Sequence, residues 1–363
     1  MPPRSNASLK VMSVIGARPQ FVKAAVVSQA LKAHNIQEIL VHTGQHFDAN
    51  MSDVFFKDLD LPTPDYNLDI HSLGHGAMTG RMMEALETLA LAEKPDWLLV
   101  YGDTNSTLAG ALVAAKLHIP IAHVEAGLRS YNRAMPEEVN RLLTDQLSEL
   151  LFVPTPLAID CLAKEGITQG VHLIGDVMMD AVLTYQVKAE KCSTVLADQG
   201  LTPNGYYLAT VHRPGNTDDP DKLRAILEAF GALDAPVVLP LHPRTQGRIK
   251  EFALEKPLAH ANIKRIPPAN YLDMLMLEKH CRGVVTDSGG IQKEAYLCRR
   301  PCFTLRPETE WKEMVEAGWN RLVTAEDLVA AIAAFTPPDT WPNLYGDGDA
   351  ATQVAKRLLT HFQ

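Results

Sequence analysis

Short apolar runs separated by polar stretches set the pattern of this 363-residue chain. The runs are rich in Val, Ile and Leu, which is typical of strands that are buried on both faces of a parallel sheet. Between them lie stretches with helical periodicity, such as 76–92, and this alternation predicts βαβ units in a doubly wound α/β fold. The predicted strands cover 9–15, 39–41, 97–101, 119–124, 150–153, 171–174, 206–211, 237–241, 263–266, 283–285 and an edge-like 303–306.

The alternation occurs twice, which predicts two Rossmann-like domains in a chain that is too long for one ordinary core. The stretch 184–204 is more polar and less periodic than its surroundings, so we place the domain junction near its beginning. The predicted domains are therefore residues 1–183 and 184–349, and a last helix is expected from about residue 350.

Charge and composition exclude several classes of function. A formal net charge of -9 argues against a general nucleic-acid or membrane-surface binder, although it leaves room for a local basic pocket. No apolar run is long enough to span a bilayer, and the first residues lack the hydrophobic core of a signal peptide. The five cysteines form no C-x-x-C pair, which favours reduced thiols and a cytoplasmic protein.

Polar side chains follow many of the predicted strands, at the point where each strand ends. Ligands of open α/β sheets bind beyond the carboxyl ends of the strands, so this clustering predicts a cleft that is lined from both domains. The residues in question are Arg18, the segment from His42 to His46, Asp103, Glu125, His212, His242 and Ser288.

The segment Ser288-Gly289-Gly290 follows a buried strand and opens a helix. Two glycines at a helix N-terminus let the backbone approach a ligand, and free N–H groups there bind anions such as phosphate. The same segment would also serve as an ordinary tight turn with Ser288 as the helix cap. Both interpretations stay open at this point.

The acidic candidates have similar alternatives. Asp103 either caps the following helix or takes part in chemistry, whereas Glu125 precedes Ala126-Gly127, a poor context for a surface ion pair. Glu137 and Glu138 are adjacent in a first helical turn, so only one of them can face the cleft. The His42/His46 and His71/His75 pairs lie in loops that contain glycine, and we therefore expect no metal site.

Seven ordered motifs make the chain similar, over essentially its whole length, to the non-hydrolysing UDP-N-acetylglucosamine 2-epimerases. They are Gly16-Ala17-Arg18-Pro19 with Lys23, Gly102-Asp103-Thr104, His123 to Arg129, Pro136-Glu137-Glu138 with Asn140-Arg141, His212-Arg213, Thr286 to Gln292 with Glu294, and Tyr345-Gly346-Asp347-Gly348.

The resemblance implies a GT-B-like architecture, with two domains that face each other across a cleft and a last helix, 350–363, that packs back onto the first domain. It also implies a homodimer, no cofactor and no metal. The implied activity is that of an isomerase of cell-surface polysaccharide biosynthesis, which converts UDP-GlcNAc to UDP-ManNAc by eliminating UDP to a 2-acetamidoglucal and adding it back.

Proton transfer at C2 needs positioned carboxylates, and departing UDP needs positive charge and N–H donors. The resemblance assigns the catalytic roles to Asp103, Glu125, Glu137 and His212. It assigns substrate binding to Arg18, Lys23, Arg141, His242, Ser288, Gly289, Gly290, Glu294 and Arg306.

The chain departs from the family pattern at three places. Phe47-Asp48-Ala49 replaces the segment that binds a second, activating UDP-GlcNAc, and the stretch 71–79 is also changed. Trp311 replaces an arginine of the usual site. These segments resemble the branch that acts on UDP-2,3-diacetamido-2,3-dideoxyglucuronate. UDP-GlcNAc is the leading expected substrate, the uronate is the alternative, and a GT-B glycosyltransferase is the rival from another class.

Overall fold

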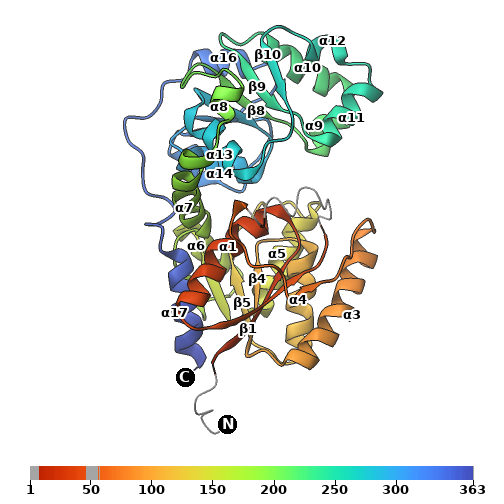
Figure 1. Ribbon diagram of the computed structural model, residues 1–363, viewed down its shortest axis with the longest axis vertical. Coiled ribbons are helices and arrows are strands. Elements are labelled where there is room, and N and C mark those ends of the chain that lie inside the picture. Colours follow the sequence, from red (N-terminus) through yellow and green to blue (C-terminus); the bar gives the residue numbers. More distant parts are fainter. Residues whose placement is uncertain (1–7, 46–55, 57, 363) are drawn as a thin grey trace. The chain divides into compact units, whose positions relative to one another are not determined.

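Strands and helices alternate along the chain in the computed structural model, which describes residues 8–45, 56 and 58–362 (Figure 1). The chain divides into two compact units. The first unit comprises Met1–Leu183 and Asn343–Gln363, and the second comprises Thr184–Pro342. Each unit is built around one parallel sheet, so the α/β class with two Rossmann-like domains is confirmed.

The first unit has a seven-stranded sheet in the order β3-β2-β1-β4-β5-β6-β7, and every strand pair in it is parallel. Helices α1 and α17 lie on one side of this sheet, and α3 and α4 lie on the other (Figure 1). Its strands are β1 (Lys10–Ile15), β2 (Gln37–His42), β3 (Tyr66–Asn67), β4 (Trp97–Tyr101), β5 (Ile121–Val124), β6 (Leu150–Val153) and β7 (Val171–Leu173). Its helices are α1 (Arg18–Ala33), α3 (His75–Glu93), α4 (Asn105–Lys116), α5 (Pro136–Leu147), α6 (Pro156–Lys164) and α17 (Ala350–Phe362).

The second unit has a six-stranded parallel sheet in the order β10-β9-β8-β11-β12-β13. Its strands are β8 (Tyr207–Thr210), β9 (Val237–Pro240), β10 (Ile263–Ile266), β11 (Gly283–Thr286), β12 (Cys302–Thr304) and β13 (Asn320–Leu322). Its helices are α8 (Val195–Asp198), α9 (Pro214–Thr217), α10 (Pro220–Gly231), α11 (Pro243–Glu251), α12 (Glu255–Leu258), α13 (Tyr271–His280), α14 (Gly289–Leu297), α15 (Lys312–Glu316) and α16 (Leu328–Ala333).

Central strands are buried along almost their whole length, as their apolar sequences require. All five residues of β4 and all four of β11 are buried, because helices cover both faces of each sheet. Parallel pairing places the ends of β1, β4 and β5 at one edge of the first sheet. The ends of β8 and β11 likewise share an edge of the second sheet, so the loops that follow them lie together.

Two local predictions were wrong. The strand at residue 303 is not an edge strand, because β12 lies between β11 and β13, and the three residues of β13 are too short a run to recognise in the sequence. The polar stretch after residue 184 is not irregular at its start, because helix α7 (Val177–Cys192) continues through it. Its residues Lys188, Ala189, Glu190 and Lys191 are good helix formers.

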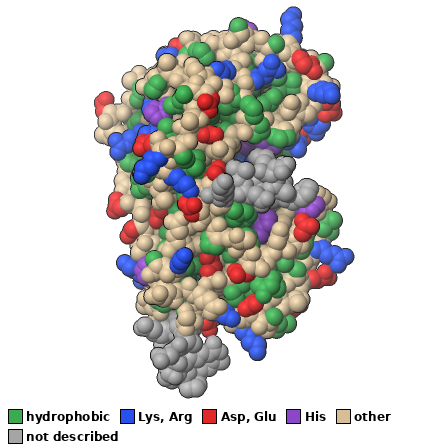
Figure 2. All heavy atoms as spheres, viewed as in Figure 1, with side chains coloured by type: hydrophobic (Ala, Val, Ile, Leu, Met, Phe, Trp, Pro, Cys, Tyr) green, Lys and Arg blue, Asp and Glu red, His purple; other side chains and the backbone are tan. Residues whose placement is uncertain are grey.

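On the face drawn in Figure 2, Lys and Arg side chains are interspersed with Asp and Glu, and exposed hydrophobic side chains are scattered. The formal net charge of -9 reflects a modest excess of acidic over basic side chains along the chain. No helix of the described residues is long and apolar enough to cross a membrane.

The chain returns to the first unit near Gly175, and a substitution at this glycine tests how closely the two segments approach there. A Cβ at this residue would lie 2.7 Å from the carbonyl oxygen of Tyr345, and φ is +82°. Gly175→Ala should therefore lower the free energy of unfolding by roughly 1–3 kcal/mol, measured by chemical denaturation. Gly166→Ala is the matched control, because φ is +81° there but no atom lies within 4 Å of the added carbon. Equal losses in the two variants would contradict a close approach at Gly175.

Candidate functional site

Glu125 is held in a strained conformation directly after β5. Its φ of +69° is in the left-handed region, which residues other than Gly rarely adopt. The backbone N–H groups of Glu125 and Ala126 both donate to the carbonyl of Phe152, at 3.1 Å each. The Lys23 ammonium lies 2.5 Å from Oε1 of Glu125, so the carboxylate is fixed and its charge is compensated.

Asp103, which follows β4, is bound by an arginine through one of its two oxygens. Nε and Nη2 of Arg141 donate to Oδ2 at 3.0 and 2.7 Å. Oδ1 has no hydrogen-bond partner among the described residues, and 29% of the side chain is exposed. An anchored carboxylate with one accessible oxygen is suited to proton transfer.

The structure distinguishes the two adjacent acids at the start of α5. Glu138 is buried, and its Oε2 accepts from Arg141 at 2.8 Å. It also accepts the backbone N–H groups of Ser130 and Tyr131, at 2.9 and 2.8 Å. Burial alone would raise the pKa of Glu138, but these hydrogen bonds and Arg141 hold it below its usual value. Glu137 is exposed and is not brought into this cluster.

Gln20 links the loop after β1 to the loop after β4, although the sequence analysis did not single it out. Its Oε1 accepts from the N–H groups of Gly16 and Ala17, at 2.7 and 3.0 Å. Its Nε2 donates to the carbonyl of Tyr101 at 2.7 Å. Arg18, the first residue of α1, lies directly beside this link. The only feature of the sequence that could have identified Gln20 is its position in the first helical turn after a predicted strand.

In the second unit, the fully buried Asp287 organises the loops that follow β8 and β11. Its carboxylate accepts the backbone N–H groups of His212 and Arg213, at 3.0–3.1 Å. It also accepts from Nδ2 of Asn216 at 3.0 Å, and Nδ1 of His212 lies 3.3 Å away. The His212 side chain is 37% exposed, so Asp287 orients an imidazole that remains accessible.

Ser288 precedes the first turn of α14, and its side chain makes no capping hydrogen bond. A Cβ at Gly289 would lie 2.5 Å from Oε1 of Glu310, whereas a Cβ at Gly290 would meet no atom within 4 Å. The first glycine is therefore required by packing inside the protein, while the second borders open space. This difference favours the anion-site interpretation over a tight turn alone.

Trp311 packs against this turn. Its Nε1 donates to the carbonyl of Gly289 at 3.1 Å, and the ammonium of buried Lys293 lies 4.2 Å from the centroid of its ring. Arg306, also buried, pairs with Glu310 at 3.0 Å. An indole and two cations therefore surround the Gly289-Gly290 turn.

His242 caps α11, where its Nδ1 accepts the backbone N–H of Arg244 at 3.1 Å. Its ring centroid lies 5.3 Å from that of His212, so the second unit brings these two predicted residues together.

Glu294 lies in α14 near a second acid, Glu278, which is fully buried in α13. Burial, and then the charge of Glu294, raise the pKa of Glu278 well above its usual range. The protonated form of the Glu278 carboxyl is therefore favoured beside the candidate ribose ligand, and helical periodicity gave no sign of this because it marks the stretch as core.

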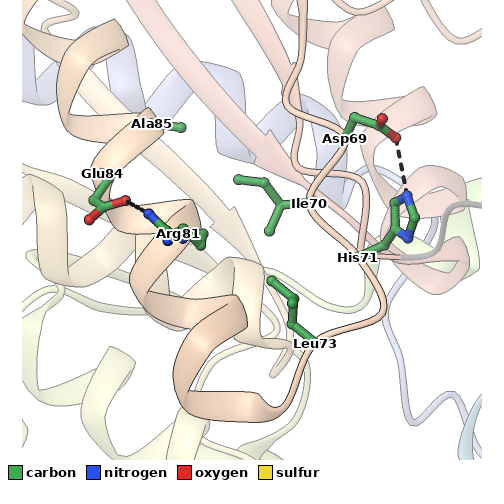
Figure 3. A pocket seen from close by; sticks show the side chains of 7 residues that line it. All are labelled: Asp69, Ile70, His71, Leu73, Arg81, Glu84 and Ala85. Atoms are coloured by element: carbon green, nitrogen blue, oxygen red, sulfur yellow. Dashed lines mark hydrogen bonds and ion pairs between the residues drawn. The ribbon is translucent and has the colours of Figure 1, made fainter.

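The described residues contain no group of three or more His, Cys, Asp or Glu side chains that could hold a metal. His46 and the segment Phe47-Asp48-Ala49 lie outside the described residues. A separate open groove of about 420 Å³ borders the start of α3 (Figure 3). Its charged side chains pair with each other, Arg81 with Glu84 and His71 with Asp69, and it contains none of the predicted site residues.

Two parallel α/β units of this kind, with polar residues after their strands, are typical of nucleotide-sugar enzymes with a GT-B-like fold. The family model described as UDP-N-acetylglucosamine 2-epimerase matches residues 29–359. The chain therefore belongs to the non-hydrolysing UDP-N-acetylglucosamine 2-epimerase family, and it is a UDP-sugar 2-epimerase, an isomerase.

Individual proteins agree with this assignment. UDP-2,3-diacetamido-2,3-dideoxy-D-glucuronate 2-epimerase of Pseudomonas aeruginosa is 50% identical, over 96% of this chain and 99% of that protein. The crystal structure of Methanocaldococcus jannaschii UDP-GlcNAc 2-epimerase in complex with UDP-GlcNAc and UDP is 42% identical, with a TM-score of 0.90 over 98% of this chain and all of that one. LpCGTa in complex with UDP, at 10% identity and a TM-score of 0.59 over 98% and 94% of the two chains, shares the fold alone.

The raised pKa of Glu278 predicts a pH dependence of stability. Because the pKa of Glu278 is raised in the folded protein, the unfolded chain loses this proton first as the pH rises. Wild-type stability should therefore fall by up to about 1.4 kcal/mol per pH unit, from the ordinary carboxyl value up to the raised one. Glu278→Gln should remove this slope in denaturation experiments across pH. Glu228→Gln, at an exposed position of α10, should keep it; a slope that survives in Glu278→Gln would contradict the assignment.

Proposed function

We propose that this enzyme inverts C2 of a UDP-2-acetamido sugar by eliminating UDP to a 2-acetamidoglucal and adding UDP back to the opposite face. The observation that carries the proposal is the pair of compensated carboxylates, Asp103 on Arg141 and Glu125 on Lys23. Carboxylates held at fixed positions are the groups that deprotonation and reprotonation of a carbon require.

Asp103 is the better candidate for the group that handles the C2 proton. Its Oδ1 has no partner among the described residues, whereas the Glu125 side chain is only 9% exposed and is bound to Lys23. We propose that Glu125 instead stabilises the elimination transition state together with Lys23. We propose Glu137, which is exposed on the first turn of α5, as the third catalytic acid.

The second unit supplies the groups that a departing diphosphate requires. The N–H groups at the start of α14 border open space at Gly290, and Arg213 approaches this turn, with Nη2 3.7 Å from the position of a Cβ on Gly289. We propose that the diphosphate binds there, with His212 and His242 beside it and the ribose on Glu294. Ser288 and Arg306 would complete the substrate contacts.

Two sugars remain candidates. The 50% identical relative bears the name of an epimerase of UDP-2,3-diacetamido-2,3-dideoxy-D-glucuronate, and the 42% identical one that of a UDP-GlcNAc epimerase. The higher identity moves the uronate ahead of UDP-GlcNAc, which was expected first as the commonest substrate of the family, and it agrees with the segments that resemble the uronate branch. Trp311 by itself does not favour the uronate, because it removes a cation where the substrate would add an anion.

The central experiment is NMR of each UDP-sugar incubated with the enzyme in D2O without any acceptor. We expect C2 inversion with deuterium incorporated at C2, and a larger kcat/KM for the uronate. Asp103→Asn and Glu125→Gln should each lose roughly 10²–10⁴-fold in turnover while still binding UDP. Turnover without deuterium incorporation would overturn the elimination mechanism, and turnover only with an added acceptor would indicate a glycosyltransferase.

Gly290→Val tests the anion turn separately. A Cβ at this position would meet no atom within 4 Å, so the fold should be intact, as judged by thermal denaturation. The valine would occupy the space beside the N–H groups, and UDP affinity measured by calorimetry should fall severely. Unchanged UDP affinity in this variant would place the diphosphate elsewhere.

A further inference from the structure

His123 is a fully buried histidine at the end of β5 that makes two short hydrogen bonds. Nδ1 lies 2.7 Å from Oδ1 of Asp145, and Nε2 lies 2.7 Å from the carbonyl oxygen of Gly102. None of the roles considered above uses this side chain.

Each ring nitrogen of His123 faces an oxygen atom. The Gly102 carbonyl can only accept a hydrogen bond, so Nε2 donates to it. Burial would raise the pKa of Asp145, but its hydrogen bond to His123 and the neighbouring Arg129 outweigh burial and hold this pKa below its usual value. Asp145 can therefore accept from Nδ1 as well, so acceptors face both ring nitrogens, the arrangement that suits an imidazolium.

The imidazolium ends a chain of alternating charges. Oδ2 of Asp145 accepts from Nη1 of Arg129 at 2.7 Å. The same Oδ2 accepts the backbone N–H of Gly127 at 3.1 Å. Arg129 in turn makes two hydrogen bonds to Glu165, at 2.8 and 2.7 Å. A buried ion pair that is fully hydrogen-bonded on both sides fixes geometry, although it need not add stability.

His123 and Asp145 each hold a loop with an unusual backbone conformation. Gly102 has φ +60° and directly precedes Asp103, and Gly127 has φ +82° and lies two residues after the strained Glu125. Gly102 also borders the other acid, since a Cβ placed on it would lie 3.5 Å from Oε1 of Glu125 and 3.6 Å from Nζ of Lys23. External hydrogen bonds hold such conformations in place.

We propose that His123 is a positioning residue, whose imidazolium fixes the Gly102 carbonyl, and with it Asp103, while Asp145 fixes the loop that carries Glu125. The inference rests on the proposed function, because it assumes that these two acids act on the sugar. His123 is buried and touches no substrate in this scheme. Its loss would displace both acids and leave the UDP-binding residues of the second unit unchanged.

The test combines kinetics with a spectroscopic measurement. In His123→Gln, the amide NH2 group can donate to the Gly102 carbonyl, but no second donor is left for Asp145. In Asp145→Asn, the negative charge that faces His123 is removed. Both variants should lose roughly 10–100-fold in kcat, with KM and UDP affinity near wild type. Glu165→Gln is the matched control, because it neutralises the far end of the same chain and contacts neither Gly102 nor Gly127; its kcat should be near wild type.

Nitrogen NMR of the histidine rings in the folded wild-type enzyme, with the His123 signals assigned by their absence in His123→Gln, should show two protonated nitrogens. A single protonated nitrogen would overturn the proposal, whatever the activity. A normal kcat in a folded His123→Gln would overturn it too. If His123→Gln does not fold, Asp145→Asn serves alone, and equal losses of kcat and UDP affinity in that variant would overturn the proposal. Wild-type enzyme that fails to invert C2 would instead refute the proposed function, while the NMR result would still decide the state of His123.

Discussion

Several loops around the candidate site depend on one kind of interaction, a buried carboxylate that accepts backbone N–H groups. Asp287 holds the start of the loop after β8, Glu138 holds residues 130 and 131, and Asp145 holds Gly127. At the far end of the chain, Asp180 accepts the N–H groups of residues 350 and 351, at the start of α17. Loops beyond parallel strands have no ladder partners for their N–H groups, so a buried acceptor satisfies the backbone and fixes its path at once.

The pKa values of Asp145 and Glu138 stay below their usual values because cations and N–H donors outweigh the effect of burial. Asp145 has His123 and Arg129, and Glu138 has Arg141 in addition to two backbone donors. Glu278 shows the opposite case, since it is buried beside another acid and its pKa is raised. In the first unit, the paired cations and N–H donors therefore favour the ionised form of Asp145 and Glu138, whereas burial raises the pKa of Asp180, which accepts backbone N–H groups, to about 6.

The sequence predicted the α/β class, the two sheets and most strands, because hydrophobic runs and strand-end polar residues are local signals. It could not separate Glu137 from Glu138, since the choice depends on which of them faces the loop at residue 130. It also missed Gln20, whose partner Tyr101 lies 81 residues away along the chain. Pairings over such distances follow from the fold and leave no periodic trace. The three-residue strand β13 was missed for a related reason, since so short a run resembles a loop.

Trp311 is a departure from the expected family pattern, yet a positive charge lies close to it. The family pattern places an arginine there, and an indole cannot replace its charge or its five donors. Here the indole keeps a single donor, which binds the Gly289 carbonyl, and its ring faces the ammonium of Lys293. Lys293 is almost completely buried one helical turn into α14, so positive charge remains close to the anion turn. The indole therefore sets the shape and the hydrogen bonding beside this turn, while Lys293 supplies a cation close to it.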